Sequence, residues 1–268
     1  MNLGKTDQIM ARPLLIIDSG SGGFTILKSI LTKIPDLSYT YAADYAGYPY
    51  GNRDAEEIVS RVKRLVSASQ NQLDHAMIVV ACNTASTFTL PVLRRTYDIP
   101  IVGVVPAIKP ACERYPRGKI LLLATPSTVE GSYIDNLVER YATGVSLHRF
   151  GSVDLVRVAE DSLHKGEQIN LVRLVVGCKA GLRYDAIVLG CTHFPLIATS
   201  LREIFNGADL IDSASGIAER VQTLRGDYLC QSASRRFFAT KDSSPPVAFL
   251  RQFGLSKPQI LRMPFSEV

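Results

Sequence analysis

Short apolar runs that alternate with amphipathic stretches dominate this chain and restrict the folds that it can adopt. The runs have the unbroken hydrophobic character of strands that are buried on both faces. They span residues 14–17, 76–80, 101–105, 120–123 and 186–189. Because parallel strands need a crossover between them, strand and helix in regular alternation indicate an α/β architecture with mainly parallel sheets.

Helical patterns fill the segments between these runs. They cover residues 23–33, 53–72, 129–141, 155–165 and 170–177. In an α/β sheet, the binding crevice lies beyond the carboxyl ends of the strands. Polar residues that directly follow an apolar run are therefore the first candidates for a functional site.

Two cysteines occupy that position in nearly the same setting. Cys82 follows one run in "VVACNTAST", and Cys191 follows another in "VLGCTHFPL". Each apolar run ends in a small residue, then a cysteine, then a threonine within two positions. Each cysteine also precedes a segment that we expect to begin a helix.

A second pair of strand ends recurs at nearly the same spacing. Asp18 and Ser19 follow the first run in "LLIIDSGSGG", and Thr125 and Thr128 follow a later run in "KILLLATPST". Internal duplication is the simplest explanation, and a chance match of short strand–helix units is the alternative. We therefore predict two similar, pseudo-symmetric α/β domains whose sheets are flanked by helices, with the active site between them.

The chain length supports two domains, because 268 residues can build two cores of ordinary size. A new strand-like segment begins at "LIDSAS", near Leu210, and we expect the chain to return there to its first half. The predicted first domain is discontinuous and comprises residues 1–105 plus 209–268. The predicted second domain comprises residues 106–208.

Composition excludes several other classes of protein. The formal net charge of +5 is spread along the chain without a basic stripe, so we do not expect nucleic acid as a partner. No segment approaches the roughly 18 apolar residues of a membrane span, and no secretory signal is recognisable, so we expect a cytoplasmic protein without a membrane partner. The five cysteines lack paired spacing, which argues against a disulfide framework.

The "DSGSGG" segment predicts a site for a small anion. Its glycines let the backbone approach a ligand, and the helix that follows directs N–H groups at the same place. The spacing is not that of a dinucleotide-binding fingerprint, and the Lys-Ser/Thr pair of a Walker loop is missing. A carboxylate is the kind of anion that fits best.

Polar side chains beside the two thiols could hydrogen-bond the carboxylate or ammonium groups of a small ligand. These side chains are Asn83, Thr84, Thr192 and His193. A metal site is not expected, because Cys191 and His193 supply only two candidate ligands. A Cys-His hydrolase remains an alternative, but it leaves Cys82 without a role.

Two thiols on opposite sides of one substrate carbon would give both cysteines a role. One thiolate would remove an acidic proton from one face, and the opposite thiol would deliver a proton to the other, which inverts the stereocentre. A cysteine that titrates near pH 8.5 can serve in either form. N–H and hydroxyl donors around the α-carboxylate would stabilise the carbanion. No segment resembles a cofactor site, so the expected activity is racemisation without a cofactor.

Five motifs in order, "DSGSGG", "YPYG", "ACNTAS", "GCTHFPL" and "LIDSAS", span nearly the whole chain. On these motifs the chain resembles the glutamate racemase family, which makes D-glutamate for bacterial peptidoglycan without a cofactor. The resemblance implies two similar α/β domains that close on glutamate, often in a homodimer. It also implies that Cys82 acts on the D-enantiomer and Cys191 on the L-enantiomer.

The resemblance assigns further residues. It implies catalytic roles for Asp18 and His193, and for Glu160 in "VRVAED", where Val153 and Arg157 replace a proline-containing segment of the family. The substrate-binding positions that match are Asp18, Ser19, Tyr50, Gly51, Asn83, Thr84, Thr125, Thr128, Thr192 and His193. A surface glutamate is the alternative interpretation of Glu160, and a simple turn that of "YPYGN".

Two other functions stay open from the sequence. A sister racemase of the same fold would act on aspartate or another small amino acid, and its turnover of glutamate and aspartate would identify it. A binding protein that keeps the fold without catalysis would show unreactive cysteines and no proton exchange.

Overall fold

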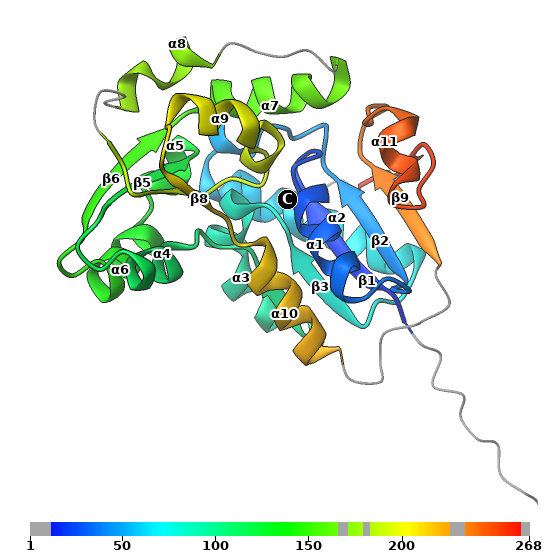
Figure 1. The fold of residues 1–268 in the computed structure, drawn as a ribbon. Coiled ribbons are helices and arrows are strands. Elements are labelled where there is room, and N and C mark those ends of the chain that lie inside the picture. The colour runs from blue at the N-terminus through cyan, green and yellow to red at the C-terminus, as the bar shows by residue number, and fades with distance from the viewer. Residues whose placement is uncertain (1–11, 166–170, 179–182, 226–233, 264–268) are drawn as a thin grey trace, which may run out of the picture.

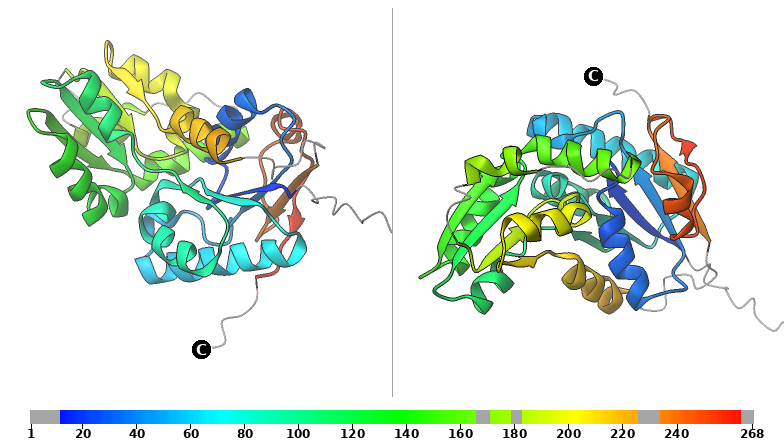
Figure 2. Two further views of the ribbon diagram at one scale, coloured as in Figure 1. Left: turned by 90° about the horizontal axis from the view of Figure 1, so that it is seen from below. Right: turned by 45° about the horizontal axis from the view of Figure 1, so that its top comes forward.

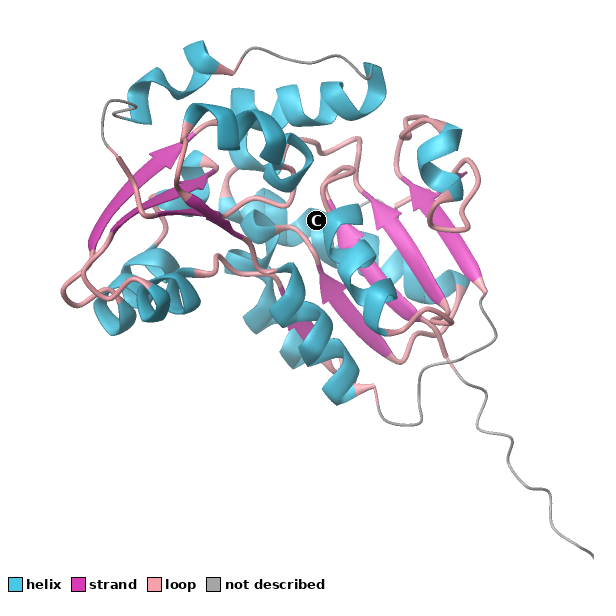
Figure 3. Ribbon diagram, in the orientation of Figure 1, coloured by secondary structure: helices cyan, strands magenta, loops and turns pink. Residues whose placement is uncertain are grey.

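Two separate parallel sheets, each flanked by helices, make up the fold (Figures 1 and 3). The computed structural model describes residues 12–165, 171–178, 183–225 and 234–263. The first sheet has the strand order β10-β9-β2-β1-β3-β4, and the second has the order β6-β5-β7-β8. All of these neighbours pair in parallel, which confirms the predicted α/β class.

The first sheet forms from both ends of the described chain. Its strands are β1 (Leu14–Asp18), β2 (Tyr39–Ala43), β3 (Met77–Val80), β4 (Ile101–Gly103), β9 (Arg235–Ala239) and β10 (Gln259–Ile260). The helices that accompany it are α1 (Phe24–Lys33), α2 (Ala55–Gln72), α3 (Asn83–Thr96), α10 (Ala214–Leu224), α11 (Val247–Arg251) and the 3-10 helix η1 (Tyr50–Asn52).

The second sheet forms from the middle of the chain. Its strands are β5 (Lys119–Ala124), β6 (Ser146–Gly151), β7 (Ala186–Leu189) and β8 (Asp209–Ile211). Its helices are α4 (Ile108–Arg114), α5 (Pro126–Val129), α6 (Ser132–Tyr141), α7 (Val153–Lys165), α8 (Val172–Val175) and α9 (Ala198–Ile204), with 3-10 helices η2 (Val176–Cys178) and η3 (Phe194–Ile197).

Strand order confirms the predicted pseudo-symmetry. The order β2-β1-β3-β4 in one sheet matches β6-β5-β7-β8 in the other, position by position. Cys82 follows β3, and Cys191 follows β7, the equivalent strand. Asp18 ends β1, and Thr125 follows β5, which is again equivalent. The two halves therefore present matching strand ends to the space between them (Figure 2).

Each sheet is covered on both faces, as the unbroken apolar runs predict. Along β1, Leu14 and Ile16 belong to a buried cluster shared with α1 and α10. Leu15 and Ile17 point the other way, into a cluster with α2 and α3. Side chains alternate between the faces of a strand, so a strand that is buried on both faces must be apolar throughout. The second sheet is enclosed in the same way by two further clusters.

The boundary between the domains differs from the prediction. The predicted first domain includes residues 209–211, but β8 pairs with β7 and completes the second sheet. The chain rejoins the first half only at α10, which packs against α1. The strand-like segment at Leu210 is β8, the edge strand of the second sheet that is equivalent to β4 of the first. The rest of the proposed division stays a prediction.

Two local predictions also need correction. The helix expected over 129–141 is interrupted, with α5 ending at Val129 and α6 beginning at Ser132. The helix expected over 170–177 is the short α8 followed by η2, and Asn170 lies outside the described residues. Within the described ranges, no helix is long and apolar enough to cross a bilayer.

Candidate active site

The predicted residues meet where the carboxyl ends of the two sheets face each other. The Thr192 hydroxyl donates to Asp18 Oδ2 at 3.1 Å, which joins the segment after β7 of one sheet to the end of β1 of the other. Thr84 and Thr125, also from opposite halves, share a hydrogen bond of 2.9 Å between their hydroxyls. The site is therefore built jointly by both domains.

The first thiol, Cys82, lies at the N-terminal end of α3. It is buried, and its Sγ lies 3.9 Å from Ser19 Oγ. Burial raises the pKa of this thiol, and the negative charges of Asp18 and Cys191 raise it further. The Ala85 N–H in the first turn of α3 acts in the opposite direction, as a helix N-terminus does for a thiolate. Ser19 follows Asp18, which accepts a hydrogen bond from Thr192 beside Cys191, so contacts link the surroundings of the two thiols.

The second thiol, Cys191, is served by an imidazole. Its Sγ lies 3.8 Å from Nδ1 of His193, and Nε2 of the same ring lies 2.8 Å from Glu160 Oε2. All three residues are buried. A thiol, an imidazole and a carboxylate in that order form a recognised arrangement for activating a sulfur.

Glu160 and His193 each shift the pKa of the other toward its charged form. Burial alone would raise the pKa of Glu160, but hydrogen bonds from His164, His193 and Ser21 hold it below its ordinary value. Burial alone would lower the pKa of His193, but Cys191 and Glu160 raise it well above its ordinary value. The carboxylate therefore stays ionised and stabilises a protonated imidazole beside Cys191.

Glu160 lies on α7 and points into the site, so its interpretation as a surface glutamate is wrong. The Ser21 N–H donates to Oε2 at 3.1 Å, and the Ser21 hydroxyl donates to Oε1 at 2.6 Å. The carboxylate that the "DSGSGG" loop holds in this structure is thus one of the chain's own. Helix α7 extends from the second sheet toward the first to make this contact (Figure 2, right).

Asp18 is the most enclosed carboxyl group of the site. Burial raises its pKa, whereas His193, the Gly20 N–H and Thr192 lower it. The Gly20 N–H donates to Oδ1 at 2.8 Å, and Ser19 Oγ lies 3.4 Å from the same oxygen. These contacts fix the carboxyl group between the two domains.

Asn83 carries an orphaned donor. Its Nδ2 is buried and has no hydrogen-bond partner within the described part of the chain. Buried polar atoms without a partner are uncommon and call for an explanation, and a bound ligand supplies one. Asn83 also lines a cavity of about 10 Å³ with Cys191 and Thr192. Such a cavity holds about one water molecule.

Threonine hydroxyls cluster on the side of Cys82. Thr128 Oγ1 lies 2.9 Å from that of Thr125 and 3.3 Å from that of Thr84. Gly51 lies close to these threonines: a Cβ added to it would stand 2.8 Å from the side chain of Thr125. Tyr50 belongs to the same buried cluster as Cys82, but its hydroxyl donates to Asp44 at 2.7 Å.

The sequence predicts that a helix begins after each thiol, and the structure agrees at Cys82 but differs at Cys191. Helix α3 begins directly after Cys82, which confirms the prediction there. Cys191 is followed instead by a turn and the 3-10 helix η3, which begins at Phe194. The proline at position 195 favours a helix start at this point, one turn later than the thiol.

Several residues of the site are not predicted from the sequence. Ser21 lies within the "DSGSGG" motif but was not singled out, although it makes two hydrogen bonds to Glu160. His164 lies four residues after Glu160 on α7, with 3.3 Å between Nε2 and Oε1. Thr25 donates across the domains to the Thr192 carbonyl oxygen at 3.1 Å. The i, i+4 spacing of Glu160 and His164 was the one usable signal in the sequence.

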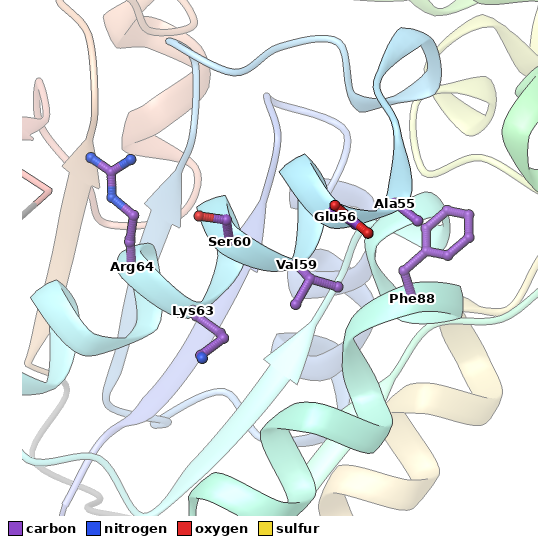
Figure 4. Close-up of a pocket in the computed structure, with 7 residues that line it drawn as sticks. All are labelled: Ala55, Glu56, Val59, Ser60, Lys63, Arg64 and Phe88. Carbon is purple, nitrogen blue, oxygen red and sulfur yellow. The ribbon is translucent and has the colours of Figure 1, made fainter. Parts of the chain in front are cut away.

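A larger groove lies on the outer face of the first domain. Its volume is about 530 Å³, and Val59, Lys63 and Phe88 on α2 and α3 line it (Figure 4). Neither thiol contributes to its lining. Across the described ranges, no cluster of three or more His, Cys, Asp or Glu side chains could hold a metal ion.

Comparison with known proteins identifies the family. Residues 24–221 match the family model described as Asp/Glu/Hydantoin racemase. The chain belongs to this family. Among its relatives, the glutamate racemase of Photorhabdus laumondii is 41% identical over 258 residues, which cover 92% of this chain and 90% of that protein. The glutamate racemase of Proteus mirabilis is 46% identical over 224 residues, covering 81% of this chain and 77% of that one.

Solved structures agree with the family assignment. Escherichia coli glutamate racemase, in complex with L-glutamate and the activator UDP-MurNAc-Ala, superposes with a TM-score of 0.86. It is 38% identical, and the match covers 95% of this chain and all of that chain, 100%. An aspartate racemase homologue from Pyrococcus horikoshii, 18% identical with a TM-score of 0.53, shares the fold. The resemblance drawn from the motifs is thus confirmed at the level of the family.

Proposed function

We propose that this chain is a glutamate racemase that interconverts L- and D-glutamate by a two-base reaction of Cys82 and Cys191. The observation that carries the proposal is the pair of buried thiols at equivalent strand ends, each with its own supporting groups. Cys82 has Ser19 and the start of α3, and Cys191 has His193 and Glu160. The relatives named as glutamate racemases support glutamate as the substrate.

In the proposed reaction, the Cys191 thiolate removes the α-proton of L-glutamate, and the Cys82 thiol delivers its own proton to the opposite face. The sulfur of Cys191 ends protonated and that of Cys82 ends as a thiolate, so the reverse reaction restores the starting state. His193 takes up the Cys191 proton before the first step and is held protonated by Glu160. A protonated imidazole beside the sulfur favours the thiolate, which is the form that accepts the α-proton.

The remaining polar groups would bind the substrate. The Asn83 amide, which is buried and unpartnered in the described structure, is suited to the α-carboxylate. Thr84, Thr125 and Thr192 supply hydroxyls on both sides of the cleft. Such donors stabilise the negative charge that develops when the α-proton leaves. No group outside the chain is needed for these steps, so we propose a cofactor-free reaction.

We also propose that the protein works in the cytoplasm, supplies D-glutamate for peptidoglycan and forms a homodimer. These statements rest on the family resemblance. Sedimentation of the purified protein would test the dimer.

Chiral analysis of reaction mixtures tests the substrate. Purified, reduced protein is incubated with L-glutamate and, in parallel, with L-aspartate. Conversion of glutamate alone to a racemic mixture is expected. Faster conversion of aspartate would instead identify a sister racemase, and no conversion of either would favour a binding protein.

A further inference from the structure

Hydrogen bonding around Glu160 extends beyond His193 to a second imidazole. Nε2 of His164 lies 3.3 Å from Glu160 Oε1, one helical turn further along α7. The side chain of His164 is 28% exposed, whereas that of Glu160 is 9% exposed. A solvent-accessible imidazole therefore contacts a buried carboxylate of the site.

The two oxygens of Glu160 divide their donors evenly. Oε2 accepts from the Ser21 N–H and from His193, and Oε1 accepts from the Ser21 hydroxyl and from His164. An ionised carboxylate only accepts hydrogen bonds, so Nε2 of both imidazoles carries a hydrogen. When His193 is neutral, its Nδ1 is therefore the unprotonated nitrogen that faces the Cys191 thiol. The contact of the carboxylate with Nε2 thus sets the tautomer that His193 presents to the sulfur.

We propose that His164 is a positioning residue for the Cys191 half of the site. By donating from Nε2 to Oε1, it holds the Glu160 carboxylate in the rotation that keeps Oε2 on His193. Without this donor, Oε1 retains the Ser21 hydroxyl alone, and the carboxylate gains freedom to turn away from the imidazole. The kinetic consequences rest on the proposed glutamate racemase function, whereas the consequence for the reactivity of the Cys191 thiol does not.

Three variants separate this role from others. His164→Leu removes the donor and places an apolar side chain of similar size at this partly exposed position. His164→Gln keeps an uncharged N–H near the place of Nε2. Lys165→Ala is the matched control, because it alters the next residue of the same helix, which contacts Asp161 rather than Glu160.

The first readout is thiol alkylation, which needs no substrate. Reduced protein is treated with iodoacetamide, and the labelled peptides of Cys191 and Cys82 are quantified in the same sample. Their ratio cancels differences in domain opening, because both thiols are buried in the same site. A thiolate is the reactive species, and a carboxylate-bound imidazole favours it at Cys191. Losing a hydrogen bond to a charged group predicts about a tenfold fall of the ratio in His164→Leu.

The second readout is steady-state kinetics with L-glutamate. His164 contacts Glu160 rather than substrate, so His164→Leu should lower kcat about tenfold and leave KM nearly unchanged. His164→Gln should restore most of the wild-type value in both readouts, and Lys165→Ala should match the wild type. Circular dichroism checks that all variants are folded.

The results decide between positioning and its alternatives. A wild-type alkylation ratio in His164→Leu would overturn the proposal. So would a loss in His164→Gln as large as that in His164→Leu, because the charge of the imidazole would then matter rather than its N–H. If the wild-type protein does not racemise glutamate, the proposed function fails, and the alkylation ratio still tests the positioning role.

Discussion

Thr192 and Asp18 join the two domains directly, through a hydrogen bond of 3.1 Å from the threonine hydroxyl to Oδ2. Thr192 follows Cys191 in the chain, and Asp18 precedes Ser19, which contacts Cys82. One short path of contacts therefore links the neighbourhoods of both thiols. A substitution that breaks one of these contacts should lower kcat more than it lowers the free energy of unfolding.

Gly22→Ala is predicted to impair catalysis by steric overlap. A Cβ at this position would overlap Nδ1 of His193 and stand 2.6 Å from the Thr192 hydroxyl. Small displacements of catalytic groups are costly, so kcat should fall by about tenfold to a hundredfold. Gly216→Ala in α10 is the matched control, because nothing lies within 4 Å of its Cβ position. The control should keep full activity and gain about 0.5 kcal/mol of stability. Unchanged kcat in Gly22→Ala would contradict the geometry of His193.

Acid denaturation should reveal the charge on Glu160. Its hydrogen bonds hold its pKa in the folded state below the ordinary value of 4.5, so the folded protein binds this proton less readily than the unfolded chain. The resulting stabilisation is full above pH 4.5 and declines as the pH falls toward the lower, folded-state pKa. Urea unfolding midpoints of wild type and Glu160→Gln, measured from neutral pH down to about pH 3, should converge at the acid end. A gap of constant size would show that the carboxylate is not ionised.

Arg61→Ala is predicted to be strongly destabilising. Arg61 Nε lies 2.6 Å from Asp44 Oδ2, and the Asp44 side chain is fully buried, 0% exposed. Removing one partner of a buried ion pair leaves an uncompensated charge, which costs about 3 kcal/mol. Because Tyr50 donates to the same carboxylate, KM should rise as well.

The matched control for Arg61→Ala is Arg157→Ala, which breaks an ion pair with Asp154 whose side chains are 54% and 65% exposed. Pairs of that kind contribute less than about 1 kcal/mol. Free energies of unfolding from urea titrations give the comparison. Equal losses in the two variants would mean that Asp44 is stabilised without Arg61.

Each cysteine of the site should be indispensable. Cys82→Ser and Cys191→Ser are both expected to abolish racemisation while leaving the fold intact, because a serine hydroxyl is far too weakly acidic to replace a thiol. Cys112→Ser is a suitable control, since Cys112 is buried among residues of α4 and the second sheet. Chiral analysis after incubation with either enantiomer is the measurement. Full activity in either active-site variant would exclude the two-thiol reaction.

Activity should also be independent of pyridoxal phosphate. Treating the enzyme with a carbonyl reagent that strips this cofactor, followed by dialysis into reducing buffer, should leave the rate unchanged. Loss of activity that pyridoxal phosphate restores would contradict a cofactor-free reaction.

Sequence patterns predict the strands that are unbroken aliphatic runs better than the other strands. Residues 14–17 and 186–189 are apolar throughout because helices cover both of their faces. Strand β6, at an edge, has no fully buried residue, and β9, which lies between β10 and β2, begins with Arg235 and Arg236, so neither forms an apolar run. Such strands depend on pairing with a neighbouring strand, and that neighbour is not visible in the local sequence.

In the site too, some residues are predictable from the local sequence, and others only from the contacts between distant segments. Cys82 and Cys191 are identifiable because each lies two positions after the end of a strand, where a parallel sheet places its functional groups. Ser21 and His164 become relevant only when α7 carries Glu160 to the loop before α1. Similarly, the direction of the Tyr50 hydroxyl depends on Asp44, which the motif "YPYG" does not contain.

Deuterium incorporation at the α-carbon tests the two-thiol racemase most directly. Purified, reduced protein is incubated with L-glutamate in deuterated water, and optical rotation and the α-proton signal are followed together, with L-aspartate in parallel. The account predicts loss of rotation accompanied by α-deuterium for glutamate and not for aspartate. Glutamate that keeps both its rotation and its α-proton would contradict it.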